Sequence, residues 1–225
     1  MDPLLQIAEE LERRDALAAQ ALLDVERLQA EVDELRAHAA AVAAFLRELP
    51  ATRAALDDEE RAAADAQVRA TAARGVAEEE LARVQERGSE SARLEAARVA
   101  QHARDAVEEA DLRVARARQE RTRLEAEAAE RGEEAEQLER RGAELSAHPR
   151  FEHDVAPPAT GLHGLLDWAS QARGELIVAH AALATERDTI VREATELLAG
   201  ALGEPLAGTG VAGVRDRLSE ALGIH

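Results

Sequence analysis

The sequence feature that most constrains this chain is an apolar stripe from Leu4 to Leu49, in which the spacing alternates between three and four residues. Thirteen of the fourteen positions are apolar. The exception is Arg14, whose long side chain we expect to reach the edge of the stripe. Heptad spacing over six repeats predicts a long helix that pairs along one face. The predicted self-association seam consists of Leu4, Ile7, Leu11, Val25, Leu28, Val32, Leu35, Val42 and Leu46.

Local signals predict where this first helix begins and ends. Asp2 followed by Pro3 is typical of a helix start. Pro50 removes a backbone donor and disfavours helical geometry at the residue before it, so the helix should stop or kink there. We therefore expect helices at about 3–49 and about 52–87. Asp57 and Glu60 have the spacing of a capping box at the start of the second helix.

The stripe that follows Pro50 consists mostly of alanine and continues in a third helical segment at about 90–147. Small side chains allow close packing but remove little apolar surface from water. The sequence leaves two possibilities for residues 88–91, GSES. A turn there would give a bundle of four unequal helices, whereas a continuous helix over 52–147 would let the other long helices lie along its two halves.

Prolines then divide the chain. Residues 148–161 contain three of the six prolines and form a predicted linker. The linker separates a coiled-coil region at 1–147 from a C-terminal helical region at 162–225. Thr160 is the expected cap of the next helix.

The C-terminal region is predicted to contain a long helix at about 162–202 and a short one at about 212–222. The apolar stripe of the long helix is wide, which indicates contact with more than one neighbour. Trp168 is expected to anchor it. A glycine-rich linker at 203–213 lies between the two helices.

Composition supports an all-α fold of long helices packed as an antiparallel coiled coil or extended helical bundle, without a β-sheet. The chain has 53 alanines and only three Phe and Trp residues together. Alanine, leucine, glutamate and arginine are the best helix formers, and aromatic residues are too scarce for a sheet core. The sequence contains no Cys or Lys, which excludes disulfides, thiolate chemistry and lysine Schiff bases.

Charge argues against two classes of partner. The formal net charge is −18, which repels the phosphates of nucleic acids and anionic lipid surfaces. We therefore expect no nucleic-acid partner and consider a membrane partner unlikely. The first residues, MDPLLQIAEE, lack a basic leader before an apolar run, and no apolar stretch is long enough to span a bilayer. A cytoplasmic location is expected.

One segment matches a nucleotide-binding motif by its letters. Residues 208–213, GTGVAG, fit the pattern GxGxxG. That motif requires a strand before it and a βαβ unit around it, whereas a helix is predicted here. We expect a flexible linker and no cofactor.

Histidines are the other candidate ligands. His148, His153, Asp154 and His163 lie in or beside the proline-rich linker, and imidazole and carboxylate groups bind metals. Their spacing matches no helical metal pattern, so a polar linker without a metal is the favoured interpretation. His180 lies on the stripe of the 162–202 helix, where a histidine satisfied by a neighbour is favoured over a catalytic one.

Two resemblances bear on function. The carboxylates of residues 57–60, DDEE, follow the expected bend at Pro50, and they resemble the acidic hairpin tips of bacterial transcript-cleavage factors that enter RNA polymerase. The acidic, Ala/Glu-rich composition resembles that of phage-shock and ESCRT-III-like membrane remodellers. Those proteins begin with a membrane-binding amphipathic helix, whereas this chain carries Glu9, Glu10 and Glu12 there.

The sequence therefore favours a non-enzymatic structural or adaptor protein that pairs through its helices. The expected partners are a second copy, giving a homodimer, and an unidentified protein. Two alternatives stay open. One is a polymer-forming membrane remodeller, and the other is a metal-binding or catalytic bundle that uses the linker histidines.

Overall fold

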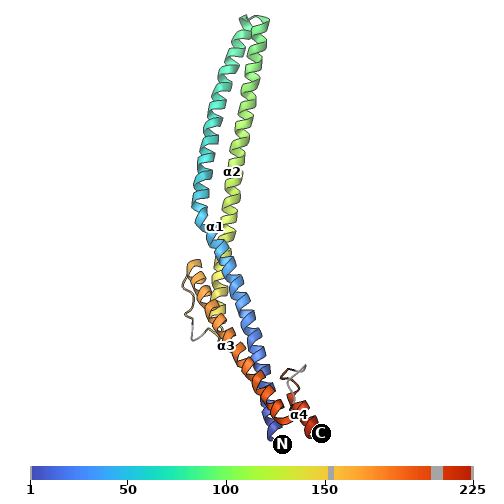
Figure 1. The fold of residues 1–225 in the computed structure, drawn as a ribbon. Coiled ribbons are helices and arrows are strands. Elements are labelled where there is room, and N and C mark those ends of the chain that lie inside the picture. Colours follow the sequence, from blue (N-terminus) through green and yellow to red (C-terminus); the bar gives the residue numbers. More distant parts are fainter. Residues whose placement is uncertain (1, 152–154, 204–209, 224–225) are drawn as a thin grey trace. The chain divides into compact units, whose positions relative to one another are not determined.

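The structure is a computed structural model that describes residues 2–151, 155–203 and 210–223. Its elements are α1 (Pro3–Arg87), α2 (Glu90–Ser146), α3 (Leu162–Leu202) and α4 (Val214–Leu222). The described residues contain no strand. α1 packs antiparallel to α2 and to α3 (Figure 1). The predicted all-α fold of long antiparallel helices is confirmed.

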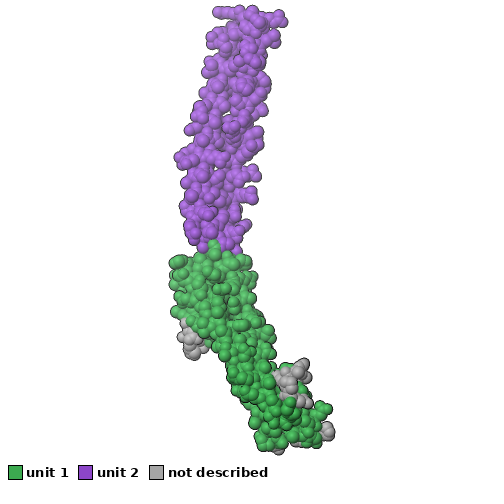
Figure 2. Space-filling view, in the orientation of Figure 1, with its two compact units in different colours: residues 1–40, 137–225 green, residues 41–136 purple. Residues whose placement is uncertain are grey.

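The chain divides into two compact units, coloured separately in Figure 2. The terminal unit contains residues 1–40 and 137–225, and the hairpin unit contains residues 41–136. The terminal unit thus combines the start of α1, the end of α2, and all of α3 and α4. The hairpin unit consists of the remaining parts of α1 and α2.

Pro50 does not end a helix, so the prediction of separate helices at about 3–49 and 52–87 is wrong. α1 continues from Pro3 to Arg87 with Pro50 inside it. A proline within a helix removes one backbone hydrogen bond, at a cost of about 3 kcal/mol. Good helix formers surround Pro50, and Leu49 is buried against the rest of the hairpin unit. The packing of a long helix offsets the local loss.

Gly88 and Ser89 form the turn between α1 and α2, which settles the open question in favour of a break. The backbone N–H of Gly88 donates to the carbonyl oxygen of Val84 at 2.7 Å. The hydroxyl of Ser89 accepts a hydrogen bond from the backbone N–H of Ala92 at 3.4 Å, which helps to cap α2. The chain therefore reverses direction at Gly88 and Ser89.

Small side chains fill the interior of the hairpin unit, as the sequence predicts. Among its buried residues, most are alanines and the larger members are mainly valines. Typical examples are Ala63 and Ala77 on α1, and Ala100, Val107 and Val114 on α2. Because each alanine removes little apolar surface from water, stability here depends on the length of the pairing.

The predicted self-association seam lies largely inside the single chain. Its buried members are Leu11, Val25, Leu28, Val32, Leu35 and Val42. Leu4 and Leu46 are partly buried, and Ile7 is 49% exposed. The sequence could not distinguish pairing within a chain from pairing between chains, because heptad seams look alike in both. The chain's own helices cover most of this seam.

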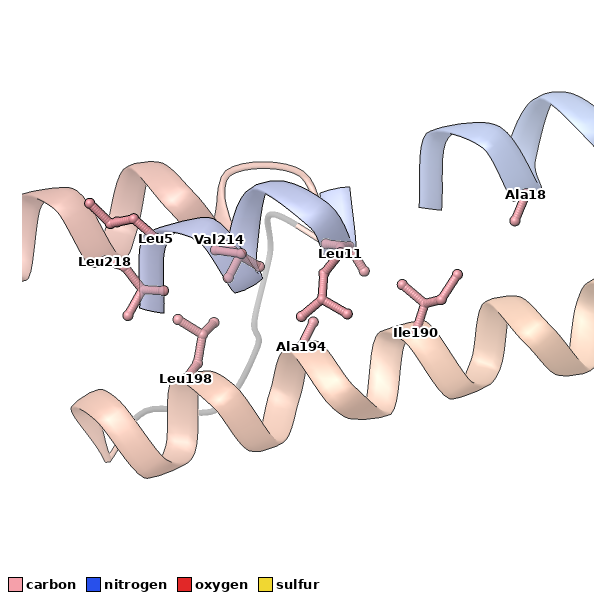
Figure 3. Close-up of a cluster of buried hydrophobic side chains, with 10 residues drawn as sticks. Leu5, Leu11, Ala18, Ile190, Ala194, Leu198, Val214 and Leu218 are labelled. Carbon is pink, nitrogen blue, oxygen red and sulfur yellow. The ribbon is translucent and has the colours of Figure 1, made fainter. Parts of the chain in front are cut away.

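The core of the terminal unit includes a cluster of leucines, valines, alanines and an isoleucine (Figure 3). Leu5 and Leu11 of α1, Leu198 of α3, and Val214 and Leu218 of α4 all belong to it. The cluster brings the two ends of the described chain together. It also confirms that α3 contacts more than one neighbour, as its wide stripe predicts.

The start of α3 differs from expectation because Thr160 does not cap it. The cap residue is Gly161, which has φ of 89° and makes no side-chain cap hydrogen bond. Such a positive φ favours glycine. The N–H of Gly161 instead donates to Glu139 Oε2 of α2 at 3.0 Å. A carboxylate from a neighbouring helix therefore holds this end of α3.

Candidate interaction surfaces

Charged and polar pairs connect the two arms of the hairpin unit. In several of these pairs, the two residues lie equally far from the turn along the sequence. Arg53 and Glu125 are equally far from Ser89 along the sequence, on opposite arms, and their atoms Nη2 and Oε2 are 2.6 Å apart. Gln67 and Asp111 are likewise equidistant from Ser89 and form a 2.7 Å hydrogen bond. Pairs equidistant from the turn keep the same residues opposite each other along both arms.

The densest of these contacts involves Asp57, Glu60 and Arg121. Arg121 Nη1 lies 3.2 Å from Asp57 Oδ1 and 3.1 Å from Glu60 Oε2. The hydrogen bond from Arg121 to Glu60, and then the charge of Asp57, raise the pKa of Arg121. These side chains, with Arg61, line a shallow hollow of about 400 Å³. The carboxylates of Asp57 and Glu60 on α1 thus form ion pairs with Arg121 on α2.

This arrangement corrects two sequence predictions about residues 57–60. Asp57 and Glu60 lie within the continuous α1, so they do not form a capping box at a helix start. They also lie far from the turn at Gly88 and Ser89, so they do not form an acidic hairpin tip. Both predictions depended on a break at Pro50, and the resemblance to transcript-cleavage factors fails with it.

Ion pairs also connect α1 with α3 in the terminal unit. Arg14 Nη1 lies 2.8 Å from Glu193 Oε2, so this residue of the stripe reaches the edge of the helix pair as expected. Arg187 Nε donates to Asp15 Oδ1 at 2.8 Å, and this hydrogen bond raises the pKa of Arg187. Such exposed pairs contribute about 0.2–1 kcal/mol each to the stability of the fold, so their main effect is to fix how α1 aligns with α3.

The turn after α2 packs between α1 and α3. Phe151 is fully buried, and its ring meets that of Trp168 edge to face, with the centroids 5.7 Å apart. This contact confirms Trp168 as an anchor of α3. Two hollows adjoin the turn, and Pro149 and Arg150 line both of them: one hollow of about 360 Å³ lies against α3, and one of about 280 Å³ lies against α1.

The candidate metal ligands are not gathered into a site. His148 Nδ1 accepts a hydrogen bond from the backbone N–H of Arg150 at 3.2 Å, while His163 lies 3.6 Å from Asp167. His153 and Asp154 lie outside the described residues. Within the described ranges, no group of three or more histidine, cysteine, aspartate or glutamate side chains is placed to hold a metal.

His180 has a neighbour on another helix. Its Nε2 lies 3.4 Å from Glu26 Oε1 of α1. The histidine lies at the edge of the α1–α3 pair with about two-fifths of its side chain exposed. Its position is that of an interhelical contact.

The glycine-rich segment leads into α4. Residues 208 and 209 of the motif lie outside the described residues. Gly213 has φ of 86° and occupies the N-cap of α4, a short helix. The helical element that precedes the segment is α3. The strand–turn–helix context that a dinucleotide site needs is therefore absent from the described part of the chain.

Several contacting residues were missed by the sequence reasoning, including Arg53, Glu125, Gln67 and Asp111. A signal for them was present, because oppositely charged or hydrogen-bonding residues recur at equal distances from Ser89. Using that signal requires the turn to be known first. The exposed apolar positions Leu17 and Val178 were likewise not singled out.

Comparisons with protein-family models, curated proteins and solved structures find no match. Among the described residues, no helix has both the length and the apolar character needed to cross a bilayer.

Proposed function

We propose that this chain is a non-enzymatic adaptor that acts through helix–helix pairing with a protein partner or a second copy of itself. The observation that carries the proposal is the hairpin unit, two antiparallel arms aligned by contacts equidistant from Ser89. At about 1.5 Å per residue, the α1 arm from residue 41 to residue 87 is about 70 Å long. An arm of this kind presents long helical faces to a partner.

The side chains on the outer faces support this function. Most are charged, and a few large apolar ones are also exposed: Val68 and Val76 on α1, and Leu94 and Leu112 on α2. At about 3.6 residues per turn, the spacing from Leu94 to Leu112 is a whole number of turns, so both lie on one face of α2. Partner choice would be set by the pattern of Glu and Arg around such positions.

The buried seam limits how a second copy can bind. Because Val25, Val32 and Val42 are covered by helices of the same chain, two copies cannot pair through them without exchanging helices. A homodimer would therefore use the outer faces, and the predicted seam would serve folding.

Site-specific photo-crosslinking tests the proposal. The chain has no lysine, so amine-reactive crosslinkers find no side chain to react with along the helices. A photoreactive amino acid would replace Val68, Val76, Leu94 or Leu112, one at a time, in the full chain expressed in its native cells. We expect discrete crosslinked species from some positions and not others, identified by mass spectrometry.

A mixture of tagged and untagged chains would separate self-pairing from pairing with another protein. Samples kept dark provide the background. If no position crosslinks and light scattering shows a monomer at the cellular concentration, the adaptor function is wrong.

A further inference from the structure

The outward side of α3 contains a stretch without charged side chains. Residues 176–185, LIVAHAALAT, contain no Asp, Glu, Arg or Lys, although 33% of the chain's residues are charged. A helix segment that lacks charges on every side is typical of a helix that is covered on every side. Leu176 is fully buried, but Val178 is 65% exposed and Ile177 is 45% exposed. The described chain therefore covers only the inner side of this stretch.

The exposed residues of α3 include one heptad-spaced stripe, named here the α3 outer stripe. It runs from Asp167 to Arg192, and the spacing between its eight members alternates between four and three residues. This spacing places all of them on one face of the helix. Every member is exposed. The stripe carries charge only toward its two ends, and its central members are Gly174, Val178, Ala181 and Thr185.

The central part of the stripe is complementary to a second copy of itself in the antiparallel orientation. When two identical helices run in opposite directions about a two-fold axis, residues that are equally far from the midpoint of the stripe face each other. In that alignment, Val178 faces Ala181 of the second copy, and Gly174 faces Thr185 of the second copy. Each larger side chain thus lies opposite a smaller one, which favours close packing of the two helices.

Two further apolar side chains widen the contact. Ile177 and Val191 each precede a member of the stripe by one residue, and they are 45% and 38% exposed. Residues that flank the seam of a helix pair contact the flanking residues of the other helix. Ile177 would therefore lie beside Ala184 of the second copy, so the apolar contact is wider than the stripe itself.

The charged members of the stripe complement each other in the same alignment. Asp167 faces Arg192 of the second copy, and this pairing occurs at both ends of the helix pair. Within the described part of the chain, Arg192 has no ion-pair partner, and Asp167 has only the imidazole of His163, 3.6 Å away. Gln171 faces Asp188 of the second copy, whose carboxylate can accept a hydrogen bond from the amide. Both outer contacts are therefore favourable.

Other alignments of two α3 helices lose this complementarity. In a parallel pair, each member of the stripe would face its own equivalent, so Asp167, Asp188 and Arg192 would each meet a like charge. Displacing the antiparallel pair by one heptad would place Val178 opposite Asp188, or Asp167 opposite Thr185. The net charge of −18 also repels two copies from each other, so contact between them requires a surface that is locally neutral. The centre of the stripe is such a surface.

We propose that the α3 outer stripe binds the same stripe of a second copy, so that two chains form an antiparallel α3–α3 pair about a two-fold axis. The stripe is about 38 Å long at about 1.5 Å per residue. This inference rests on the proposed adaptor function and names the surface through which the chain pairs with itself. The buried seam of α1 stays within each chain, so no helices are exchanged.

Sedimentation equilibrium of the full chain over a series of concentrations tests the proposal. The chain has one Trp and no Tyr, so interference optics are used for detection. We expect a reversible equilibrium between monomer and dimer. Val178→Glu should weaken it at least about tenfold, because a carboxylate would be buried without a partner opposite Ala181. Val68→Glu makes the same change at an exposed valine of the hairpin unit, and should alter the association constant by less than about twofold.

The two valines are matched because their side chains are 65% and 68% exposed in the single chain. Neither substitution should disturb the fold of the monomer, and circular dichroism would verify this.

Charge exchange tests the outer pairs. Arg192→Asp should weaken association about fivefold, because Asp167 of each copy then meets a like charge. Adding Asp167→Arg exchanges the two charges and should restore the wild-type constant. Adding Glu79→Arg instead restores the same net charge at an exposed position of the hairpin unit, and should not restore association. The comparison separates the specific pair from the effect of net charge.

Disulfide trapping tests the orientation, because the chain has no cysteine of its own. Equal amounts of a Gln171→Cys chain and an Asp188→Cys chain are mixed and oxidised, and mass spectrometry identifies the products. The antiparallel pair predicts disulfides between the two different chains. In it, the two copies of position 171 are about 26 Å apart along the helix axis, far beyond the reach of a disulfide. A parallel pair would instead join like positions.

Three results would overturn the proposal: a monomer at every concentration, equal weakening by Val178→Glu and Val68→Glu, or disulfides that join like positions. A monomer that still crosslinks to another protein from the hairpin unit would reject this surface and leave the adaptor function intact. A dimer that only Val68→Glu disrupts would place self-pairing on the hairpin unit, with the same consequence.

Discussion

Replacing Gly142 of the terminal unit with alanine has two opposing effects on stability. Alanine has the higher helix propensity, but its methyl group must fit into a packed core. Gly142 is buried near the end of α2. A Cβ built there would overlap Cδ1 of Leu165 and lie 3.7 Å from Cδ2 of Leu35. Leu35 and Leu165 are only 2% and 1% exposed, so the side chain of Leu165 can turn away only by moving among other buried atoms. The substitution should therefore strain the contact among α1, α2 and α3.

The magnitude follows from two opposing terms. Alanine is favoured over glycine within a helix by about 1 kcal/mol. Adding a methyl group to a filled core costs about 1–3 kcal/mol. Gly142→Ala should therefore lower the free energy of unfolding by about 0–2 kcal/mol. Gly174→Ala in α3 is the matched control, because no atom lies within 4 Å of the added Cβ. It should raise stability by about 1 kcal/mol.

The assay is urea unfolding followed by the fluorescence of Trp168, which lies in the same unit as both glycines. Because the propensity gain is common to both variants, the difference between them isolates the packing cost. In a Leu165→Ala background the overlapping atom is gone, so Gly142→Ala should then be stabilising. If Gly142→Ala stabilises the wild-type chain as much as Gly174→Ala does, the packing argument is refuted.

Three other substitutions test separate parts of the structure. Leu176→Ala removes a fully buried side chain and should lower the free energy of unfolding by about 2–5 kcal/mol. Ile177→Ala changes a position that is 45% exposed and should lower it by under about 1 kcal/mol. Urea unfolding of the two variants compares these neighbouring positions directly. Hydrogen bonds from Arg53 lower the pKa of Glu125 from its ordinary value of 4.5. The ion pair between Arg53 and Glu125 therefore stabilises the folded state above pH 4.5, and this stabilisation is lost as the pH falls through the lowered pKa. Carboxyl NMR titration should find that lowered midpoint, and Arg53→Ala should return it toward 4.5; an unchanged midpoint in the variant would contradict the assignment. Gly88→Ala would place a Cβ 2.6 Å from a backbone carbonyl oxygen of the preceding turn, so thermal unfolding followed by circular dichroism should begin at a lower temperature than in wild type, and an unchanged curve would show that the turn shifts freely.

The helical fold and the buried stripe of α1 could be predicted from the sequence because both depend on residue patterns that repeat over short distances. The spacing of Leu11, Val25 and Val32 specifies one face of a helix whatever covers it. Asp2 was also identified correctly as a helix start, since its carboxylate accepts the N–H of Leu4 at 2.8 Å. These features need no knowledge of distant residues.

The failures involve interactions between distant residues. Proline has a strong local preference against helix interiors, but packing along the arm overrides it at Pro50. The cap of α3 depends on Glu139, which belongs to α2 and lies well before Gly161 in the sequence. No local pattern contains that information.

The equal spacing of contacts about Ser89 limits how the length of the hairpin can change. A segment inserted into one arm would displace every partner between the insertion and the open end, while contacts nearer the turn would stay matched. Gain or loss of length is therefore tolerated only when both arms change by the same amount at corresponding positions. Whole heptads would also keep the buried face inward. Related chains of other lengths should consequently differ by paired heptads, with Arg53 and Glu125, or their replacements, still facing each other.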